Sequence, residues 1–225
     1  MPAKLLLVSL QREADRPLII GHRGLKSDKM AENSIEAFRA ALEAGADGVE
    51  CDIRLGADGS LFCCHDRLHQ GRPVEALLEA ERKAAGFPLF LEVAELLEDY
   101  PGRGLWIESK TMASAEALLT GYEPRPQYVM ISFSDQATIA ASLCGWETVL
   151  LGAASADVLR DLAPDRLGPS AQMSLSLSDQ ELSRASVWTV DDLALAEALN
   201  ERSAWALTTN YPQQLLEFFS SPLTP

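Results

Sequence analysis

The stretch Gly48-Val49-Glu50-Cys51-Asp52-Ile53 has the apolar character of a buried β-strand, yet it carries two carboxylates two residues apart. Alternate side chains of a strand point to the same face, so Glu50 and Asp52 are expected side by side. The apolar flanks argue against a solvated strand face. This stretch is therefore expected to be an interior strand that ends at a functional site.

Short apolar strands of this kind alternate with longer helical segments along the chain, which is the pattern of parallel βα units. No low-complexity tract or Ser/Gly linker divides the sequence, so a single domain is expected over residues 1–225. Eight such units favour an α/β fold of the closed (β/α)8 type, the TIM barrel, over an open doubly wound sheet. Strands are predicted at residues 18–22, 48–53, 105–108, 128–131, 148–151, 166–167, 186–188 and 205–207.

Helices are predicted between the strands from apolar spacing and capping residues. Asn33 is expected to cap a helix N-terminus, with Glu36 three residues further on at the spacing of a capping box. Further helices are expected over residues 89–97 and after Pro212. The stretch Lys4–Arg12 is expected to form a helix that covers the bottom of the barrel.

A β-hairpin extension is predicted after the second strand. The strand runs into the turn signal Gly56-Ala57-Asp58-Gly59 and returns through apolar residues 61–64 to His65. In an antiparallel pair His65 lies opposite Glu50 or Asp52, depending on the loop length, with cross-strand Cβ atoms about 5 Å apart. The hairpin therefore brings a histidine beside the two carboxylates.

Charge and composition exclude several classes of protein. The formal net charge of −14 argues against binding to nucleic acid or to an anionic membrane surface, because both require a basic footprint. No stretch approaches the ~20 apolar residues of a membrane span, and the run at residues 5–8 is too short for a signal peptide. The four cysteines form no CxxC motif and are expected to be buried and reduced. A cytoplasmic protein without stable membrane insertion is expected.

Polar side chains gather at the predicted C-terminal ends of the strands, where a (β/α)8 barrel carries its active site. His22 and Arg23 end the first strand, and Trp188 ends the seventh. Glu108 and Lys110 repeat the two-residue spacing at the end of the third strand. These residues are expected to form one site, with Trp188 as an aromatic wall for the substrate.

The chemistry of this set suits a metal-assisted phosphodiesterase. Three carboxylates with few soft ligands predict a hard divalent cation, Mg²⁺ or Ca²⁺. Attack on a phosphodiester adds negative charge to its equatorial oxygens, which a metal ion and a guanidinium stabilise. His22 and His65 on opposite sides of the phosphorus would supply the acid and the base, whereas His69 is expected to be structural or solvated.

Taken together, these motifs resemble the signature of the glycerophosphodiester phosphodiesterase family. The resemblance covers residues 18–212, and its strength lies in the combination, since each motif alone is weak. The motifs are His22-Arg23-Gly24, Glu32-Asn33-Ser34, Glu50-Cys51-Asp52, Asp58-Gly59, His65-Asp66, Glu108-Ser109-Lys110, Ser132-Phe133, Trp188-Thr189-Val190 and Thr209-Asn210-Tyr211-Pro212.

The resemblance implies a barrel that hydrolyses glycerophosphodiesters to glycerol 3-phosphate and an alcohol, a reaction of glycerol and lipid metabolism. Attack by the glycerol 2-hydroxyl through a cyclic phosphate and direct attack by water both fit it. Asp66 is expected either to orient His65 or to cap the following loop. By resemblance the acid–base pair is His22 and His65, the metal ligands are Glu50, Asp52 and Glu108, and the phosphate contacts are Arg23 and Lys110.

Two other functions stay open at this level. A related barrel phospholipase that cleaves (lyso)phospholipids would need an apolar rim, and no long hydrophobic loop is visible. A non-catalytic relative that binds phosphorylated ligands would usually have lost a histidine or a metal carboxylate, and this chain retains the set. Only 22 residues separate His65 from Pro88, where many family members carry a longer insertion, so a more open mouth is expected.

Overall fold

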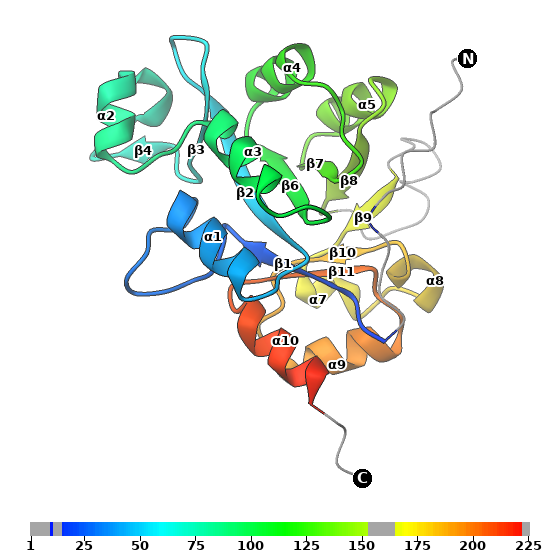
Figure 1. Ribbon diagram of the computed structural model, residues 1–225. Helices are drawn as coiled ribbons and strands as arrows, with labels where there is room; N and C mark the ends of the chain where they lie inside the picture. The colour runs from blue at the N-terminus through cyan, green and yellow to red at the C-terminus, as the bar shows by residue number, and fades with distance from the viewer. Residues whose placement is uncertain (1–9, 11–14, 153–164, 222–225) are drawn as a thin grey trace.

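The computed structural model describes residue 10, residues 15–152 and residues 165–221. The helix expected over Lys4–Arg12 lies, except for Leu10, outside the described residues. Within the described part of the chain, eight parallel strands form the barrel wall (Figure 1). They are β1 (Leu18–His22), β2 (Gly48–Leu55), β6 (Gly104–Ser109), β7 (Tyr128–Ser132), β8 (Glu147–Leu151), β9 (Arg166–Gly168), β10 (Ser186–Val187) and β11 (Ala206–Thr209).

The strands are neighbours in the order β10-β11-β1-β2-β6-β7-β8-β9. The two ends of this order meet through isolated parallel bridges, Leu167 with Ala185 and Ser170 with Trp188. The sheet therefore closes on itself almost completely. The predicted (β/α)8 barrel is confirmed, and each of the eight predicted strands is present.

Buried apolar side chains fill the inside of the barrel, because alternate residues of each strand point inward. Continuing this alternation by two residues from Ile20 and from Trp106 reaches His22 and Glu108. These polar residues thus form the uppermost layer of side chains inside the barrel. The layers beneath it are Leu18, Ile20, Trp106, Val129, Ile131, Val149, Leu151, Trp205 and Ala206.

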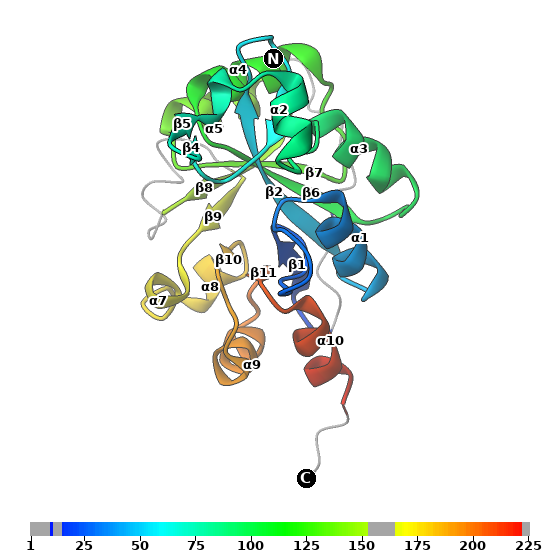
Figure 2. The same cartoon turned by 90° about the vertical axis from the view of Figure 1, so that its left-hand side faces the viewer.

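Helices cover the outside of the barrel (Figures 1 and 2). They bury a second layer of apolar side chains against the strands. In the described residues each helix is too short or too polar to cross a bilayer. The helices are α1 (Ile35–Glu43), α2 (Glu79–Ala84), α3 (Phe90–Glu98), α4 (Met112–Gly121), α5 (Asp135–Leu143), α7 (Ala171–Ser174), α8 (Asp179–Leu182), α9 (Leu193–Glu201) and α10 (Pro212–Ser220).

The hairpin extension is present, since β3 (Leu61–Cys63) pairs antiparallel with β2. The segment that follows folds over it as β4 (Leu68–His69), β5 (Arg72–Pro73), the 3-10 helix η1 (Val74–Ala76) and α2. In Figure 1 this segment lies to one side of the barrel. The short connection between His65 and Pro88 therefore carries small elements of its own.

The expected pairing of His65 was wrong by one residue. The Cys64 amide donates to the Asp52 carbonyl at 3.0 Å, so Cys64 and not His65 lies opposite Asp52. The reason is a loop of five residues, Gly56–Ser60, in which the Asp58 carboxylate accepts from the amide and the hydroxyl of Ser60. The loop was expected to end at Gly59.

The expected cap of α1 was also wrong. Ser34 caps this helix, because its hydroxyl accepts from the Ala37 amide at 3.1 Å. Asn33 instead has φ 57°, in the left-handed region that few residues other than glycine adopt, and its side chain turns to Asp52. Moving the cap by one residue frees Asn33 to act in the site.

The cysteines are free thiols, as expected, and three of them are buried. Cys51 and Cys63 face each other within the core, and Cys64 precedes His65. Cys144 is exposed at the C-terminal end of α5, which corrects the expectation that all four would be buried.

Candidate active site

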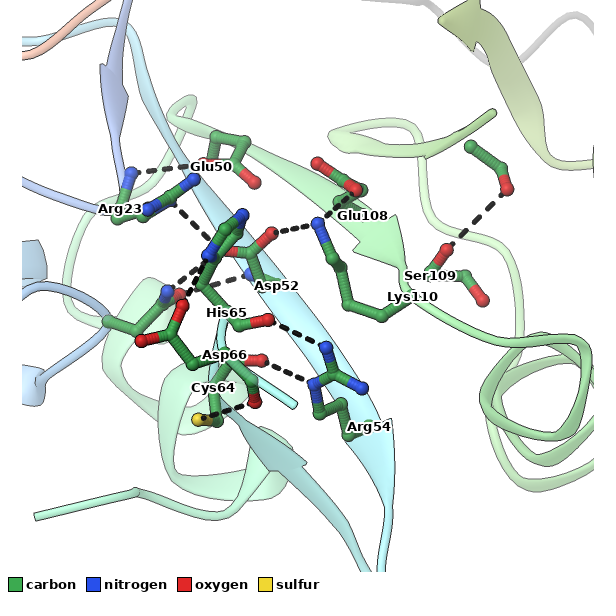
Figure 3. Close-up of polar contacts among 12 residues, drawn as sticks. Arg23, Glu50, Asp52, Arg54, Cys64, His65, Asp66, Glu108, Ser109 and Lys110 are labelled. Atoms are coloured by element: carbon green, nitrogen blue, oxygen red, sulfur yellow. Dashed lines mark hydrogen bonds and ion pairs between the residues drawn. The ribbon is translucent and has the colours of Figure 1, made fainter. Parts of the chain in front are cut away.

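Three carboxylates from two adjacent strands meet at the C-terminal mouth of the barrel. Glu50 and Asp52 project from β2, and the parallel register places Asp52 next to Glu108 of β6. One ligand oxygen from each of the three lies within 4.8 Å of the others. Figure 3 shows the three side chains at the ends of their strands. Asp52 is completely buried and Glu50 nearly so, whereas Glu108 is partly exposed.

Asp52 is held by contacts on both carboxylate oxygens. Asn33 Nδ2 donates to Oδ2 at 2.8 Å, and Asn33 Oδ1 accepts from the Asp52 amide at 3.0 Å. The Arg23 Nε lies 3.1 Å from Oδ2, and the Lys110 Nζ lies 3.2 Å from Oδ1. Two cations and one amide therefore hold this side chain in a single orientation.

The loop after β1 carries Arg23 over the carboxylates. The Arg23 amide donates to Glu50 Oε2 at 3.0 Å, and its guanidinium also pairs with the exposed Glu32 at 2.8 Å. Gly24 makes this approach possible, since its φ is +90° and a Cβ there would lie 2.5 Å from the backbone of Ala37. The glycine lets the loop pack directly on α1.

Burial and mutual repulsion shift the pKa values of the carboxyl groups. The pKa of Glu50 is raised by burial and then by the charges of Asp52 and Glu108. The pKa of Glu108 is raised by burial and by Asp52. Burial also opposes the charge of Asp52, but Lys110 and Arg23 outweigh it, so that the pKa of Asp52 is lowered. Glu50 is therefore the carboxylate whose charge is least compensated.

The residues fit a hard divalent cation. Glu50 Oε1 is buried and has no hydrogen-bond partner among the described residues. A buried carboxylate oxygen without a partner is costly unless a cation reaches it. Three carboxylates with oxygen atoms in one cluster are the donor set that Mg²⁺ and Ca²⁺ prefer.

The first histidine lies at the end of β1, directly beside Glu50 in the register. His22 Nδ1 hydrogen-bonds with Asn210 Oδ1 at 2.9 Å. Burial lowers the pKa of His22, although the hydrogen bond with Asn210 works in the opposite direction. The imidazole is therefore favoured in its neutral form, and Nε2 is the nitrogen left for proton transfer.

The second histidine approaches from the hairpin. His65 Nδ1 lies 2.9 Å from Asp66 Oδ1, which decides between the two roles expected for Asp66 in favour of orienting His65. The buried Arg54 donates to the backbone carbonyls of Cys64 and His65 at 3.1 and 2.7 Å. Arg54 therefore fixes the backbone at His65 (Figure 3).

Lys110 and Trp188 complete the predicted set. Lys110 Nζ lies 2.6 Å from Glu108 Oε1, in addition to its contact with Asp52. Trp188 is half-buried, donates from Nε1 to the Gly168 carbonyl at 2.8 Å, and meets the ring of the exposed Phe133 edge to face. A small cavity lies at this mouth of the barrel. It is lined by His22, Glu50, Trp106, Glu108, Ile131, Val149, Leu151, Ser186, Trp188 and Thr208.

All eight predicted residues thus lie at one mouth of the barrel. His69 lies elsewhere, with its ring against Phe87, as expected for a structural histidine. Sequence reasoning gave no role to Arg54 or Asp191, and it treated Asn210 only as part of a motif. Their contacts join segments far apart in the chain, and a two-residue spacing or a cap signal does not reveal such contacts.

Comparison with known proteins finds a family whose model matches part of this site. Residues 22–89 match the model of the glycerophosphoryl diester phosphodiesterase family. The match covers less than half of the chain, and over these residues the chain is similar to members of this family. The matched region contains both histidines and two of the three carboxylates, so the family match includes most of the candidate site.

Curated relatives cover part of the chain. The "Probable glycerophosphodiester phosphodiesterase 1" of Mycobacterium tuberculosis is 37% identical over 97 residues, which are 43% of this chain and 31% of that protein. The "Glycerophosphodiester phosphodiesterase" of Caldanaerobacter subterraneus is 35% identical over 102 residues, 37% of this chain and 42% of that protein. The chain therefore spans less than half the length of these relatives in the aligned regions.

Solved structures match over almost the whole barrel. A glycerophosphodiester phosphodiesterase from Thermotoga maritima has a TM-score of 0.79 at 23% identity, covering 91% of this chain and 99% of that one. A phosphodiesterase from Oleispira antarctica, in complex with its product sn-glycerol-3-phosphate, has a TM-score of 0.75 at 22% identity, covering 92% and 98%. At these identities the likeness demonstrates the fold.

Proposed function

We propose that this protein hydrolyses glycerophosphodiesters to glycerol 3-phosphate and an alcohol, with the aid of a divalent cation. The observation that carries the proposal is the meeting of three carboxylates and two imidazoles at one mouth of a barrel that resembles this family. The named activity of the curated relatives supports it. So does the glycerol 3-phosphate bound to the Oleispira antarctica phosphodiesterase.

Glu50, Asp52 and Glu108 would hold the cation, Mg²⁺ or Ca²⁺. The unpartnered Glu50 Oε1 and the raised pKa values of Glu50 and Glu108 support this choice of ligands. When bound, such a cation polarises the phosphoryl group and stabilises the negative charge of the transition state.

His22 and His65 are the proposed acid–base pair. Each ring is anchored through Nδ1, which leaves Nε2 as the nitrogen that takes or gives a proton. One imidazole removes a proton from the attacking group, which is either water or the glycerol 2-hydroxyl, and the other donates a proton to the alcohol oxygen as its bond to phosphorus breaks. If the 2-hydroxyl attacks, the product of this step is a cyclic phosphate, which water then opens to glycerol 3-phosphate. Each proton transfer contributes roughly 10²–10⁴-fold to the rate.

Arg23, Lys110 and Trp188 are the proposed substrate contacts. Arg23 shares its guanidinium with an exposed carboxylate, Glu32, and can turn from it to a phosphate oxygen. Lys110 stands at the edge of the carboxylate cluster with its ammonium partly exposed. The indole of Trp188 offers an apolar wall to the glycerol or to the leaving alcohol.

We further propose that residues 1–225 act as one domain on a small molecule, without nucleic acid and without stable membrane insertion. The net charge of −14 supports this choice of partner. The buried free thiols agree with the proposed cytoplasmic location.

The proposed function is tested by measuring glycerol 3-phosphate released from a panel of glycerophosphodiesters that carry choline, ethanolamine, glycerol or inositol. The expected result is release with Mg²⁺ or Ca²⁺, loss of release in EDTA, and recovery on adding the metal back. Full activity in the chelator would reject the metal. Preference for lysophosphatidylcholine over glycerophosphocholine would favour a phospholipase instead.

Single histidine variants test the acid–base pair. His22→Ala and His65→Ala are expected to lower kcat by several orders of magnitude while the circular dichroism spectrum stays unchanged. His69→Ala is the matched control, because it removes the same side chain away from the site and should keep near-parental turnover. Near-parental turnover in either of the first two variants would reject the assignment.

A further inference from the structure

Asp191 is linked to the site through a chain of hydrogen bonds. Its Oδ1 accepts from the Thr209 hydroxyl and from the Asn210 amide, both at 2.9 Å, and its Oδ2 accepts from Asn210 Nδ2 at 2.7 Å. Asn210 Oδ1 in turn lies 2.9 Å from His22 Nδ1. Asp191 is exposed, but three donors hold its carboxylate in place.

The chemistry of these groups determines where the protons lie. A carboxylate only accepts hydrogen bonds, so the NH₂ end of the Asn210 amide must face Asp191. The carbonyl end then faces His22, and a carbonyl oxygen also only accepts. His22 Nδ1 must therefore carry a proton, which leaves the lone pair of the neutral ring on Nε2.

We propose that Asp191 is a positioning residue that sets the tautomer of His22 by orienting the Asn210 amide. His65 has a carboxylate, Asp66, directly on its Nδ1, whereas His22 reaches its carboxylate through an intervening amide. The amide transmits the orientation and keeps the negative charge away from the buried His22 ring. The catalytic meaning of this relay rests on the proposed function, but the tautomer does not.

The substitution Asp191→Asn tests the relay directly. The new NH₂ group faces Asn210, so the Asn210 amide is expected to turn and present its own NH₂ group to His22 Nδ1. The ring then accepts at Nδ1 and carries its proton on Nε2. Adding Asn210→Asp to this variant gives a carboxylate that accepts from the new asparagine and from His22 Nδ1, so the double variant should restore the first tautomer.

The readout is the ¹⁵N chemical shifts of the imidazole nitrogens, recorded in EDTA without substrate. The chain has three histidines, and His22→Ala identifies the signals of His22. Asp191→Asn is expected to exchange the protonated and unprotonated nitrogens of His22, and the double variant to restore them. Asp192→Asn is the matched control, because it removes the same charge one residue away and keeps a side chain that caps α9.

Activity gives the second readout. Asp191→Asn is expected to lower kcat by roughly 10- to 100-fold with little change in KM. The size is taken by analogy from residues that hydrogen-bond to a metal-binding histidine and fix its tautomer and orientation. The double variant should recover most of the loss, and Asp192→Asn should behave like the parent. If Asp191→Asn is unfolded, Asp191→Ala serves instead, and both tautomers should be present because nothing then orients the Asn210 amide.

A His22 tautomer that is unchanged in Asp191→Asn or Asp191→Ala would overturn the relay. A switched tautomer with unchanged kcat would overturn its role in positioning. If the tautomer switches and is restored as expected but even the parent hydrolyses no glycerophosphodiester, the relay stands and the proposed function fails.

Discussion

Replacing Glu50 by glutamine removes a buried negative charge and keeps the shape of the side chain. The amide oxygen of glutamine can still accept from the Arg23 amide, as Glu50 Oε2 does. What is lost is the repulsion with Asp52 and Glu108, together with one ligand of the proposed cation. The metal-free variant is therefore expected to be more stable than the parent, and the same change should weaken metal binding.

The size of the gain follows from the distances. Two unit charges 4.8 Å apart repel by about 3 kcal/mol at an effective dielectric constant of 20. Glu50 has two such neighbours, but Arg23 offsets part of the repulsion, so a net gain of about 1–3 kcal/mol is expected. For a chain of this size, each 1 kcal/mol raises Tm by roughly 2–4 °C.

The pH dependence has a definite sign. Because the pKa of Glu50 is raised in the folded state, the parent loses stability as the pH rises above the ordinary value of 4.5. Glutamine does not titrate, so the variant does not lose stability in this way. The stability advantage of Glu50→Gln should therefore widen as the pH is raised.

Thermal unfolding followed by circular dichroism, in EDTA and in excess Mg²⁺ or Ca²⁺, measures both effects. Glu50→Gln should unfold at a higher temperature than the parent in EDTA and gain less from the metal. Glu32→Gln is the matched control, since this exposed carboxylate pairs with Arg23 outside the cluster. A lower Tm in EDTA combined with an undiminished gain from metal would refute the reasoning.

Three further changes test other parts of the structure. Asn33→Ala leaves the buried amide of Asp52 without its acceptor and removes a donor from the carboxylate, so urea unfolding should show a loss of roughly 3–5 kcal/mol. Asp58→Asn should destabilise the protein at pH 5, because hydrogen bonds from Ser60 and Arg82 lower the pKa of Asp58 to about 2. The difference in stability between variant and parent should fade as the pH falls toward 2. Urea unfolding between pH 2 and pH 5 measures this difference. Trp188→Ala should raise KM more than it lowers kcat in steady-state assays. The reason is that the indole lines the cavity, while its Nε1 proton is donated to the Gly168 carbonyl.

The barrel could be predicted because its signals are local. The longer strands are apolar runs bounded by turn residues, whereas β9, with three residues, gives only a weak pattern. The placement of Glu50, Asp52 and Glu108 followed from the same alternation. Parallel strands bring their C-terminal ends to one edge, so residues that end different strands meet in space.

The supporting contacts could not be predicted, because they depend on side chains that meet only after the chain has folded. Asn33 was expected to cap α1 and to support the site without acting as a catalyst itself, but the left-handed backbone that turns it to Asp52 has no sequence signal. Asn210 lies 188 residues from His22. Loop length decided the register of the hairpin, and the Asp58–Ser60 contacts that lengthen the loop became visible only in the structure.

The closure of the barrel between β9 and β10 has a consequence for its dynamics. Two isolated bridges join these strands, whereas β2 and β6 share a continuous register of six residue pairs. Backbone amides along the β9–β10 seam should therefore exchange with deuterium before those of β2 and β6. The carboxylates stand on the part of the wall farthest from the seam, and Trp188 stands on the seam itself. The side of the mouth at Trp188 is therefore expected to be more mobile than the opposite side, which carries the carboxylates.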